Sequence, residues 1–324
     1  MGAGRWSDLK QTALARLRRH AGADELAARA DAADARVDEL AAALAALDGT
    51  NERIAAAIGH QGELERHLHE IRDELATTHR HLQVQAVMDW IAGASLRSTP
   101  LISVVLPTRN RAELLPRAVA TVLAQRYTDW ELLIVDDAST DATPEVLAGL
   151  DDPRIRTFTG PGRGVCAARN VALAAAGGDL VAYLDDDNRM HPDWLRSIAW
   201  AFEQHPETEV LYGAFVIDDL RRAQRRGAGD LPRLVLTRYE RTALEQHNIT
   251  DIGAIAHRAG LPEAHFDEEL REMGDWDLFL RLTRDTVPLT LPAVACYYES
   301  HATDRLSAGP THGVDGDRIR SKVR

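Results

Sequence analysis

Three consecutive carboxylates and an amide follow directly on a short apolar run in this chain. Residues 180–184 are Leu-Val-Ala-Tyr-Leu, and the next residues are Asp185, Asp186, Asp187 and Asn188. A short run of branched and aromatic side chains predicts a strand buried on both faces, and ligands of open α/β sheets bind beyond the carboxyl ends of strands. Adjacent acids repel one another unless a cation or several donors hold them. The stretch predicts a site for Mg²⁺ or Mn²⁺, hard ions that share their oxygen ligands with substrate phosphates, and a solvated acidic turn is the alternative.

Other predicted strands end in residues that can join this site. The predicted strands cover residues 102–106, 130–135 and 155–158, and the predicted helices cover 115–125, a stretch that begins at 143, and 165–176. Strands that alternate with helices predict a parallel α/β domain. Pro107 and Thr108 follow the first strand, and Asp136 and Asp137 follow the second. We therefore expect these strand tips to meet the three acids at one edge of the sheet. A glycine-rich turn at 160–164 matches a dinucleotide-binding fingerprint only in part, and a tight turn explains it equally well.

The composition describes a globular protein without a bias toward nucleic acid. The 324 residues are 45% hydrophobic and 27% charged, and the net charge is -12. Cys166 and Cys296 lie far apart in apolar surroundings, which favours buried thiols in a reduced protein over a disulfide. No stretch reaches transmembrane length, and the first residues lack the apolar core of a signal peptide. We expect a cytoplasmic protein that acts in solution or at the inner face of the membrane.

Residues 1–95 are expected to form helices. Residues 1–20 are basic and amphipathic, so they lie either in solvent or in peripheral contact with an anionic membrane. Apolar positions then recur at spacings of three and four: Leu26, Ala30, Ala33, Val37, Leu40, Leu44, Leu47, Ile54 and Ile58. The seam predicts a coiled-coil homodimer with Asn51 at an a position, an antiparallel hairpin, or a helical layer packed on the main domain. Residues 96–100 read as a linker, 101–307 as the α/β domain and 308–324 as a polar, disordered tail.

Several blocks of the chain match one enzyme family in the family's order. They are ISVVLPTRNRAELLPRAVATVLAQRYTDWELLIVDDASTD, GVCAARNVALAAAGGDLVAYLDDDN, FDEEL, GDWDLFLRL and YYESH. Together these blocks resemble the inverting family 2 glycosyltransferases, nucleotide-sugar-dependent enzymes with the GT-A fold. The resemblance covers residues 100–307. It implies a mostly parallel sheet flanked by helices and the transfer of a sugar from a nucleoside-diphosphate sugar to a hydroxyl acceptor.

The resemblance assigns the first two strand tips to the nucleotide. Asp137 resembles the acid that accepts the imide N–H of the base, while Pro107, Thr108 and Arg109 line the base pocket. Asp136 is implied to support the end of its strand. A carboxylate at position 137 suits uracil, thymine or guanine, which present an N–H, and therefore a UDP, dTDP or GDP sugar. Arg109 departs from the aromatic residue that is frequent there, which bears on the choice of donor.

The resemblance assigns the acidic triplet, which matches the family's DXD motif, to the metal and the sugar nucleotide. Asp187 resembles the metal ligand, and Asp185 and Asp186 are implied to reach the ribose or a metal-bound water. The ion would neutralise the departing nucleoside diphosphate. His301 matches a C-terminal histidine that completes the metal or diphosphate site in this fold, and a structural histidine is the alternative.

Asp275 resembles the catalytic base. An inverting displacement needs a carboxylate opposite the leaving group, where it takes the proton of the acceptor hydroxyl. In the alternatives, Asp275 only caps the following helix, or Asp277 is the functional acid. Gly274 stands where members frequently carry Glu or Gln, which bears on the acceptor. Residues 248–255 match the floor of the family's acceptor pocket.

The resemblance implies a metal-dependent enzyme that transfers one sugar per encounter. Processive members carry a Gln and an Arg-Trp pair after the base, and the sequence after Asp275 contains neither. A sugar-nucleotide-binding scaffold with little turnover is the alternative, and Gly274 is its best support. A nucleotidyltransferase is disfavoured, because the Gly-x-Gly-Thr-Arg loop expected after its first strand is missing from residues 107–111.

Overall fold

The computed structural model describes residues 31–32, 34–43, 46, 61–218, 233–299 and 312–323. The chain divides into two compact units, residues 1–76 and 77–324, and the boundary lies inside helix α3 (Gln61–Gly93). The described residues of the first unit are helical. Val37 and Leu40 of the predicted seam are exposed, and most other seam positions lie outside the described residues, so the coiled coil stays a prediction. None of the described helices is long and apolar enough to cross a membrane.

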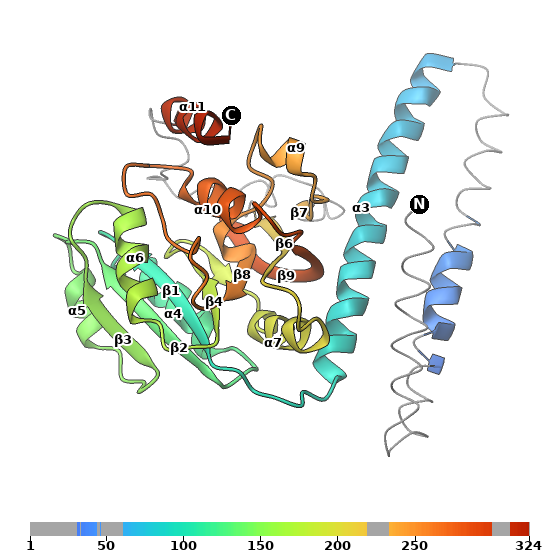
Figure 1. Cartoon of the computed structure of the whole chain (residues 1–324). Coiled ribbons are helices and arrows are strands. Elements are labelled where there is room, and N and C mark those ends of the chain that lie inside the picture. Colours follow the sequence, from blue (N-terminus) through green and yellow to red (C-terminus); the bar gives the residue numbers. More distant parts are fainter. Residues whose placement is uncertain are drawn as a thin grey trace. The chain divides into compact units, whose positions relative to one another are not determined.

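The second unit is built on a nine-stranded sheet in the order β3-β2-β1-β4-β8-β6-β9-β5, with β7 paired to β6 (Figure 1). The strands are β1 (Ile102–Thr108), β2 (Trp130–Asp136), β3 (Ile155–Thr159), β4 (Leu180–Tyr183), β5 (Arg189–Met190), β6 (Val210–Asp218), β7 (Arg233–Val235), β8 (Ile255–Arg258) and β9 (Leu289–Glu299). β1 runs parallel to β2 and β4, and β2 runs parallel to β3, as the alternation of strands and helices predicts. β8 is antiparallel to β4 and β6, so the sheet becomes mixed beyond β4.

The register of the sheet brings three strand ends to one level. Thr108 of β1 pairs with Asp136 of β2, and Val105 of β1 pairs with Tyr183 of β4. Continuing the second register by three residues places Asp186 opposite Thr108. The Thr108 hydroxyl donates a hydrogen bond of 2.7 Å to Asp186 Oδ2, which agrees with this placement. The polar residues that follow β1, β2 and β4 therefore share one edge.

Alternate residues of the central strands enter two separate cores, as expected for a sheet that is covered on both faces. The helices of this unit after α3 are α4 (Leu115–Leu123), α5 (Thr143–Ala148), α6 (Val165–Ala175), α7 (Trp194–Gln204), α9 (Arg241–Leu244), the 3₁₀ helix η1 (Ile252–Ala254), α10 (Gly274–Leu282) and α11 (His312–Val323). Val104 of β1 packs in the core that contains residues of α3, α4 and α7. Val105 packs in the core that contains residues of α6, α10 and α11.

Part of the tail that the sequence predicts to be disordered is the helix α11. Ile319 is fully buried in the core beside α10, and Asp315 is 5% exposed. Lys322 Nζ lies 2.7 Å from carboxylate oxygens of both Asp267 and Asp277. The prediction of disorder is wrong for residues 312–323, because one apolar residue and several charge pairs attach this polar segment to the domain.

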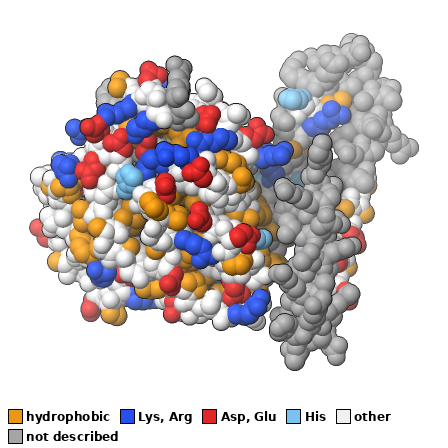
Figure 2. All heavy atoms as spheres, in the orientation of Figure 1, with side chains coloured by type: hydrophobic (Ala, Val, Ile, Leu, Met, Phe, Trp, Pro, Cys, Tyr) orange, Lys and Arg blue, Asp and Glu red, His pale blue; other side chains and the backbone are white. Residues whose placement is uncertain are grey.

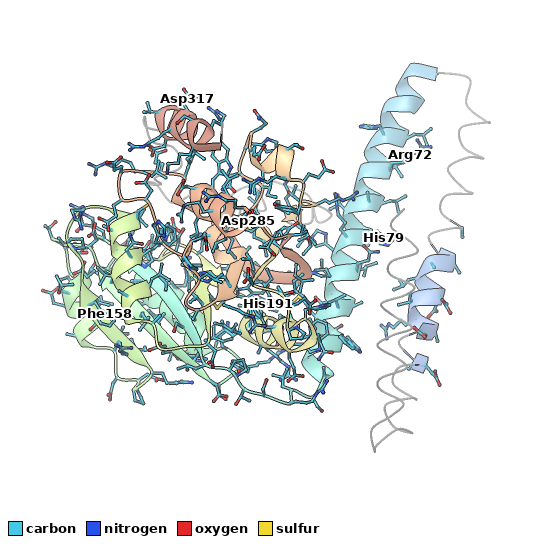
Figure 3. All side chains as sticks on the ribbon, viewed as in Figure 1. Arg72, His79, Phe158, His191, Asp285 and Asp317 are labelled. Atoms are coloured by element: carbon cyan, nitrogen blue, oxygen red, sulfur yellow. The ribbon has the colours of Figure 1, made fainter. Side chains whose placement is uncertain are left out.

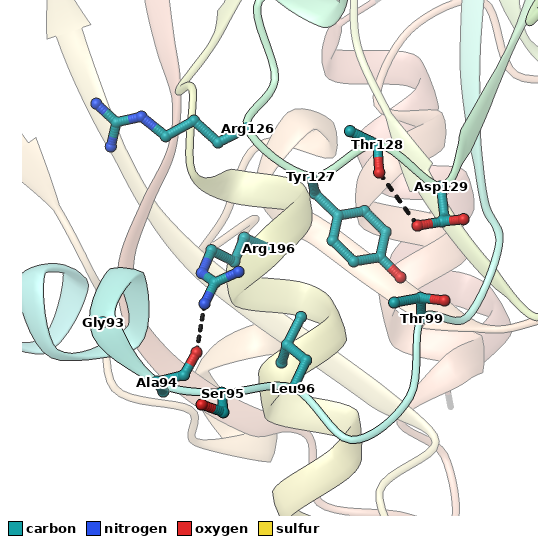
Figure 4. Close-up of a pocket in the computed structure, with 10 residues that line it drawn as sticks. All are labelled: Gly93, Ala94, Ser95, Leu96, Thr99, Arg126, Tyr127, Thr128, Asp129 and Arg196. Atoms are coloured by element: carbon teal, nitrogen blue, oxygen red, sulfur yellow. Dashed lines mark hydrogen bonds between the residues drawn. The ribbon is translucent and has the colours of Figure 1, made fainter.

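The end of α3 and the predicted linker belong to the second unit and pack against its α/β core. The side chains of α3 that lie in its core are Val84, Met88 and Ile91. Arg196 of α7 donates to the carbonyl oxygen of Ile91 at 3.1 Å and to that of Ala94, beside a cavity of about 490 Å³ (Figure 4). Glu203 accepts the backbone N–H groups of residues 97 and 98 at 2.6 and 3.0 Å. This half of α3 is a helical layer on the α/β domain.

Candidate active site

A cleft of about 990 Å³ opens at the carboxyl edge of β1, β2 and β4. The residues singled out in the sequence that line it are Pro107, Thr108, Arg109, Asp137, Asp185, Asp186, Asp187 and Asp275. Residues from 246–252 and 271–276, together with Arg320 of α11, line the wall around Asp275. Asp136 is not a lining residue, and His301 lies outside the described residues. The structure thus brings acids that are far apart in the sequence into one space.

Asp137 is enclosed by the glycine-rich turn at 160–164. The side chain is 2% exposed, and its two oxygens accept the backbone N–H groups of Gly162 and Gly164, each at 2.7 Å. Gly162 and Gly164 have φ angles of 69° and 108°, which glycine adopts without strain. A Cβ on Gly160 would lie 2.8 Å from Asp137 Oδ1. The turn therefore needs glycines because it folds closely around this carboxylate.

Arg109 and Asp136 are the neighbours of Asp137 at the end of the sheet. Arg109 Nη1 lies 3.8 Å from Asp137 Oδ2, and its side chain is 53% exposed. The Asp136 carboxylate accepts the N–H of Ser139 at 2.9 Å, so it stabilises the turn after β2. This contact agrees with a supporting role for Asp136, away from the cleft. Two of the four lone-pair sites of Asp137 are occupied by backbone N–H groups, which leaves acceptor capacity for a ligand.

The acidic triplet is crowded and partly compensated by arginines. Arg169 donates to Asp185 Oδ1 at 2.6 Å, and Arg111 Nε lies 3.7 Å from Asp186 Oδ1. Burial raises the pKa of Asp186 to about 7, and the negative charges of Asp187 and Asp185 add to the shift. A cation beside these carboxylates would favour their ionised forms, so the triplet fits a hard divalent ion. Within the described ranges no group of three His, Cys, Asp or Glu side chains is arranged to hold a metal ion.

Asp275 lies in the first turn of α10 and faces the cleft. Asn248 Nδ2 donates to Asp275 Oδ2 at 2.8 Å, and the N–H of Trp276 donates to Oδ1 at 2.8 Å. Burial raises the pKa of Asp275, while the charge of Arg169 and these two hydrogen bonds lower it. The N-cap position of α10 is occupied by Met273, which has a left-handed φ of 54°. Asp275 is therefore not the N-cap residue of α10, and helix capping does not explain why an aspartate stands at this position.

Asp277, the alternative functional acid, belongs to the structural framework. Its side chain is 2% exposed and does not line the cleft. Arg281 lies 2.9 Å from Asp277 Oδ2, and Lys322 lies 2.7 Å from Oδ1. The first pair lies within α10 and the second joins α10 to α11, so the geometry favours Asp275 over Asp277 as the acid that meets a substrate.

Gly274 has a packing reason to lack a side chain. A Cβ at this position would lie 2.6 Å from the buried Cys166 Sγ and 3.4 Å from Phe266 Cδ1. A Glu or Gln there would point its first carbon at α6. The departure from the family pattern therefore follows from the close approach of α10 to α6.

Asp251 and Arg169 are two of the cleft residues that the interpretation of the sequence missed, and Arg111, Arg271 and Arg320 are others. Asp251 lines the cleft within the stretch matched to the acceptor floor, and burial raises its pKa to about 7, with the charges of Asp185 and Asp275 adding. Arg169 is 5% exposed and lies 5.1 Å from the Phe266 ring centroid. Its position on the apolar face of a predicted helix is the signal that could have identified it. Asp251 had no comparable signal, because its burial depends on strands far away in the sequence.

Comparisons with known proteins agree with this fold and cleft. The sequence model of "Glycosyl transferase family 2" matches residues 103–261. The putative colanic acid biosynthesis glycosyl transferase WcaA of Escherichia coli (strain K12) is 33% identical over 192 residues, which are 58% of this chain and 67% of that protein. The succinoglycan biosynthesis protein ExoO of Rhizobium meliloti (strain 1021) is 31% identical over 194 residues, 57% of this chain and 56% of that protein.

The comparison with solved structures concerns the fold. TarS of S. aureus (residues 1–349, in complex with UDP-GlcNAc) superposes with a TM-score of 0.56 and 19% identity, covering 68% of this chain and 65% of that chain. This likeness shows that the mixed α/β unit has the GT-A fold. The chain belongs to glycosyltransferase family 2 and is a glycosyltransferase, as its sequence motifs predict. The matched family region ends at residue 261, before Asp275 and α11.

Proposed function

We propose that this chain is a metal-dependent, inverting and non-processive glycosyltransferase that moves one sugar from a nucleoside-diphosphate sugar to an acceptor hydroxyl. The observation that carries the proposal is the position of Asp275, in the same cleft as Asp137 and the acidic triplet. A donor that spans the cleft would place its base near Asp137 and its diphosphate near Asp187. This arrangement leaves the sugar facing Asp275.

On the donor side, Asp137 binds and orients the base. Its free lone pairs accept an imide N–H, which selects uracil, thymine or guanine. Pro107, Thr108 and Arg109 form the walls of this pocket. Asp187, together with His301, would hold Mg²⁺ or Mn²⁺, which supplies positive charge to the departing diphosphate. TarS in complex with UDP-GlcNAc, which shares the fold, supports a nucleotide sugar as the class of donor.

On the acceptor side, Asp275 accepts the proton of the attacking hydroxyl. A bond then forms between the hydroxyl oxygen and the anomeric carbon while the bond from that carbon to the diphosphate oxygen breaks. Attack from the face opposite the leaving group inverts the anomeric centre. Asn248 fixes the rotation of the Asp275 carboxylate, and burial raises the pKa of Asp275 toward the range in which a general base is effective.

The test compares Asp275→Asn with the wild type in two assays. Thermal shift with UDP, dTDP and GDP, with and without Mn²⁺, identifies the nucleotide, because ligands of the folded state stabilise it. Hydrolysis of the corresponding sugar nucleotide is then expected to fall at least about 100-fold in Asp275→Asn, the lower range for loss of a general base, while nucleotide binding is retained. Asp285→Asn is the matched control, because Asp285 is exposed and does not line the cleft (Figure 3).

The same assays separate the enzyme from a sugar-nucleotide-binding scaffold. A scaffold would bind the nucleotide and show hydrolysis that is equally weak in the wild type and in Asp275→Asn. Analysis of the product anomer by NMR tests inversion. Retention of the donor's anomeric configuration in the product would contradict a single displacement assisted by Asp275.

A further inference from the structure

Two arginines lie on the part of the cleft wall that surrounds Asp275. Arg271 lies four residues before Asp275 in the sequence, and Arg320 lines the cleft from α11. The guanidinium carbon of Arg320 lies 5.8 Å from the Trp276 ring centroid, and Trp276 is the residue after Asp275. Both arginines therefore belong to the surroundings of the base.

Arg271 and Arg320 differ from Arg169, another arginine of the cleft, in how their charges are compensated. Within the described part of the chain, no carboxylate lies within ion-pair distance of the exposed Arg271 guanidinium. Arg320 pairs at 2.5 Å with Asp317, whose side chain is 81% exposed (Figure 3), and such surface pairs contribute little. By contrast, Arg169 is bound to the buried side of Asp185 at 2.6 Å. The wall around Asp275 therefore offers the exposed guanidinium of Arg271 and the surface-paired guanidinium of Arg320, beside the acids Asp251, Glu272 and Asp275 that also line it.

The α11 helix holds this wall in place. Asp315 Oδ2 accepts the backbone N–H of Arg271 at 2.9 Å and that of Glu272 at 2.7 Å, and Ile319 is fully buried. Arg320 follows Ile319 directly, so its backbone is anchored. A guanidinium on an anchored backbone loses less freedom when it binds a ligand than one on a mobile segment.

We propose that the acceptor carries an oxyanion, a phosphate or a carboxylate, which Arg271 and Arg320 bind next to Asp275. The inference rests on the proposed function, because Asp275 must face the acceptor hydroxyl for its neighbours to contact the acceptor. In the proposed function the donor diphosphate lies at the acidic triplet, where Arg111 is 3.7 Å from Asp186 and a divalent cation would bind. Planar guanidinium groups bind carboxylate and phosphate in a bidentate manner.

Long-range electrostatic attraction cannot bring an anionic acceptor to the cleft, because the chain has a net charge of -12. Acidic and basic side chains are interspersed over the face drawn in Figure 2, without a single sign dominating. Long-range steering would therefore oppose an anionic acceptor, so local arginines have to provide the recognition.

The experiment measures sugar binding to the protein saturated with its nucleoside diphosphate and Mn²⁺, so that the donor anion site is filled. The probes are methyl glucoside, glucuronic acid and glucose 6-phosphate, titrated by calorimetry. We expect the anionic sugars to bind at least about 10-fold more tightly than the neutral one, as for a charge-assisted hydrogen bond. The anionic probe that binds with the higher affinity identifies carboxylate or phosphate as the preferred group.

Arg271→Gln and Arg320→Gln are each expected to weaken the anionic probe about 10-fold and to leave methyl glucoside unchanged. Arg271→Glu should weaken the anionic probe further, because it reverses the charge. Arg284→Gln is the matched control, since Arg284 is exposed and outside the cleft. Circular dichroism and retained nucleotide affinity show that each variant is folded.

Equal affinity for neutral and anionic sugars would overturn the inference, as would variants that weaken the nucleotide instead of the anionic sugar. Failure of the proposed function looks different. In that case no nucleoside diphosphate would bind in the first step, or Asp275→Asn would leave hydrolysis unchanged.

Discussion

Replacement of Gly274 by alanine should strain the helix that carries Asp275, and removal of the Cys166 sulfur should relieve that strain. A Cβ on Gly274 would lie 2.6 Å from Cys166 Sγ, which is closer than such atoms approach in folded proteins. Cys166 is 2% exposed on α6, so its sulfur has little room to move. The φ of Gly274 is not left-handed, so the contact, and not the backbone, opposes the substitution.

The expected size follows from packing. An added methyl group in a close-packed core costs about 1–3 kcal/mol, and the better helix propensity of alanine offsets at most about 1 kcal/mol. Cys166→Ala removes one buried heavy atom and should cost about 1 kcal/mol, as deletion of a buried methyl does. In the double variant the new methyl occupies the space that the sulfur leaves. The two substitutions should therefore show a favourable coupling free energy of about 1–2 kcal/mol.

Urea denaturation of the wild type, both single variants and the double variant, followed by tryptophan fluorescence, measures this coupling. Gly274→Ala combined with Cys296→Ala is the control, because Cys296 is also buried but does not contact Gly274. That pair should be additive within about 0.5 kcal/mol. If the effects of Gly274→Ala and Cys166→Ala on the free energy of unfolding were equally additive, the packing explanation for glycine before Asp275 would be refuted.

Three further perturbations test the site and its support. Asn248→Ala removes a hydrogen bond that lowers the pKa of Asp275, so the acid limb of the kcat/KM profile should move to higher pH; an unmoved limb would contradict the positioning role. Asp137→Asn places an amide NH₂ against the N–H groups of the glycine turn, so calorimetry should detect at least about 10-fold weaker nucleotide binding. Burial lowers the pKa of His257 from 6.5 to about 4, so folding disfavours the proton that the unfolded chain binds below pH 6.5. Between pH 6.5 and 4 the wild type should lose about 3 kcal/mol of unfolding free energy through this group, a loss that His257→Gln should not show in urea titrations; parallel pH slopes would refute this assignment.

The central strands and the strand-end acids are predictable because their signals are local. The apolar run at 180–184 is continuous and the run at 102–106 is interrupted only by Ser103, a pattern typical of strands covered on both faces. Parallel pairing then brings their carboxyl ends together, so Asp137 and the acids after β4 meet without further information. This part of the site follows from the sheet alone.

The acceptor side is less predictable because distant contacts create it. β8 reads Ile-Ala-His-Arg and has neither strict alternation nor a continuous apolar run, yet it pairs with both β4 and β6. Asp251 and Asn248 precede β8, and their place in the cleft depends on that pairing. The helix α11 is mostly polar, and the ion pairs of Lys322 with Asp267 and Asp277 stabilise it. No local pattern encodes those partners.

The buried positive charge of Arg169 acts on carboxylates from two parts of the cleft. Its guanidinium is 2.6 Å from Asp185 of the acidic triplet, and its charge lowers the pKa of Asp275 in the first turn of α10. Asp251 lies among the same acids, and its pKa is raised by burial and by both of those carboxylates. Removing the Arg169 guanidinium would leave several buried carboxylates without a positive partner. Such uncompensated charge destabilises the fold far more than the loss of a surface ion pair. The apolar face of α6 therefore carries an arginine because the carboxylates of Asp185, Asp251 and Asp275 stand close together around it.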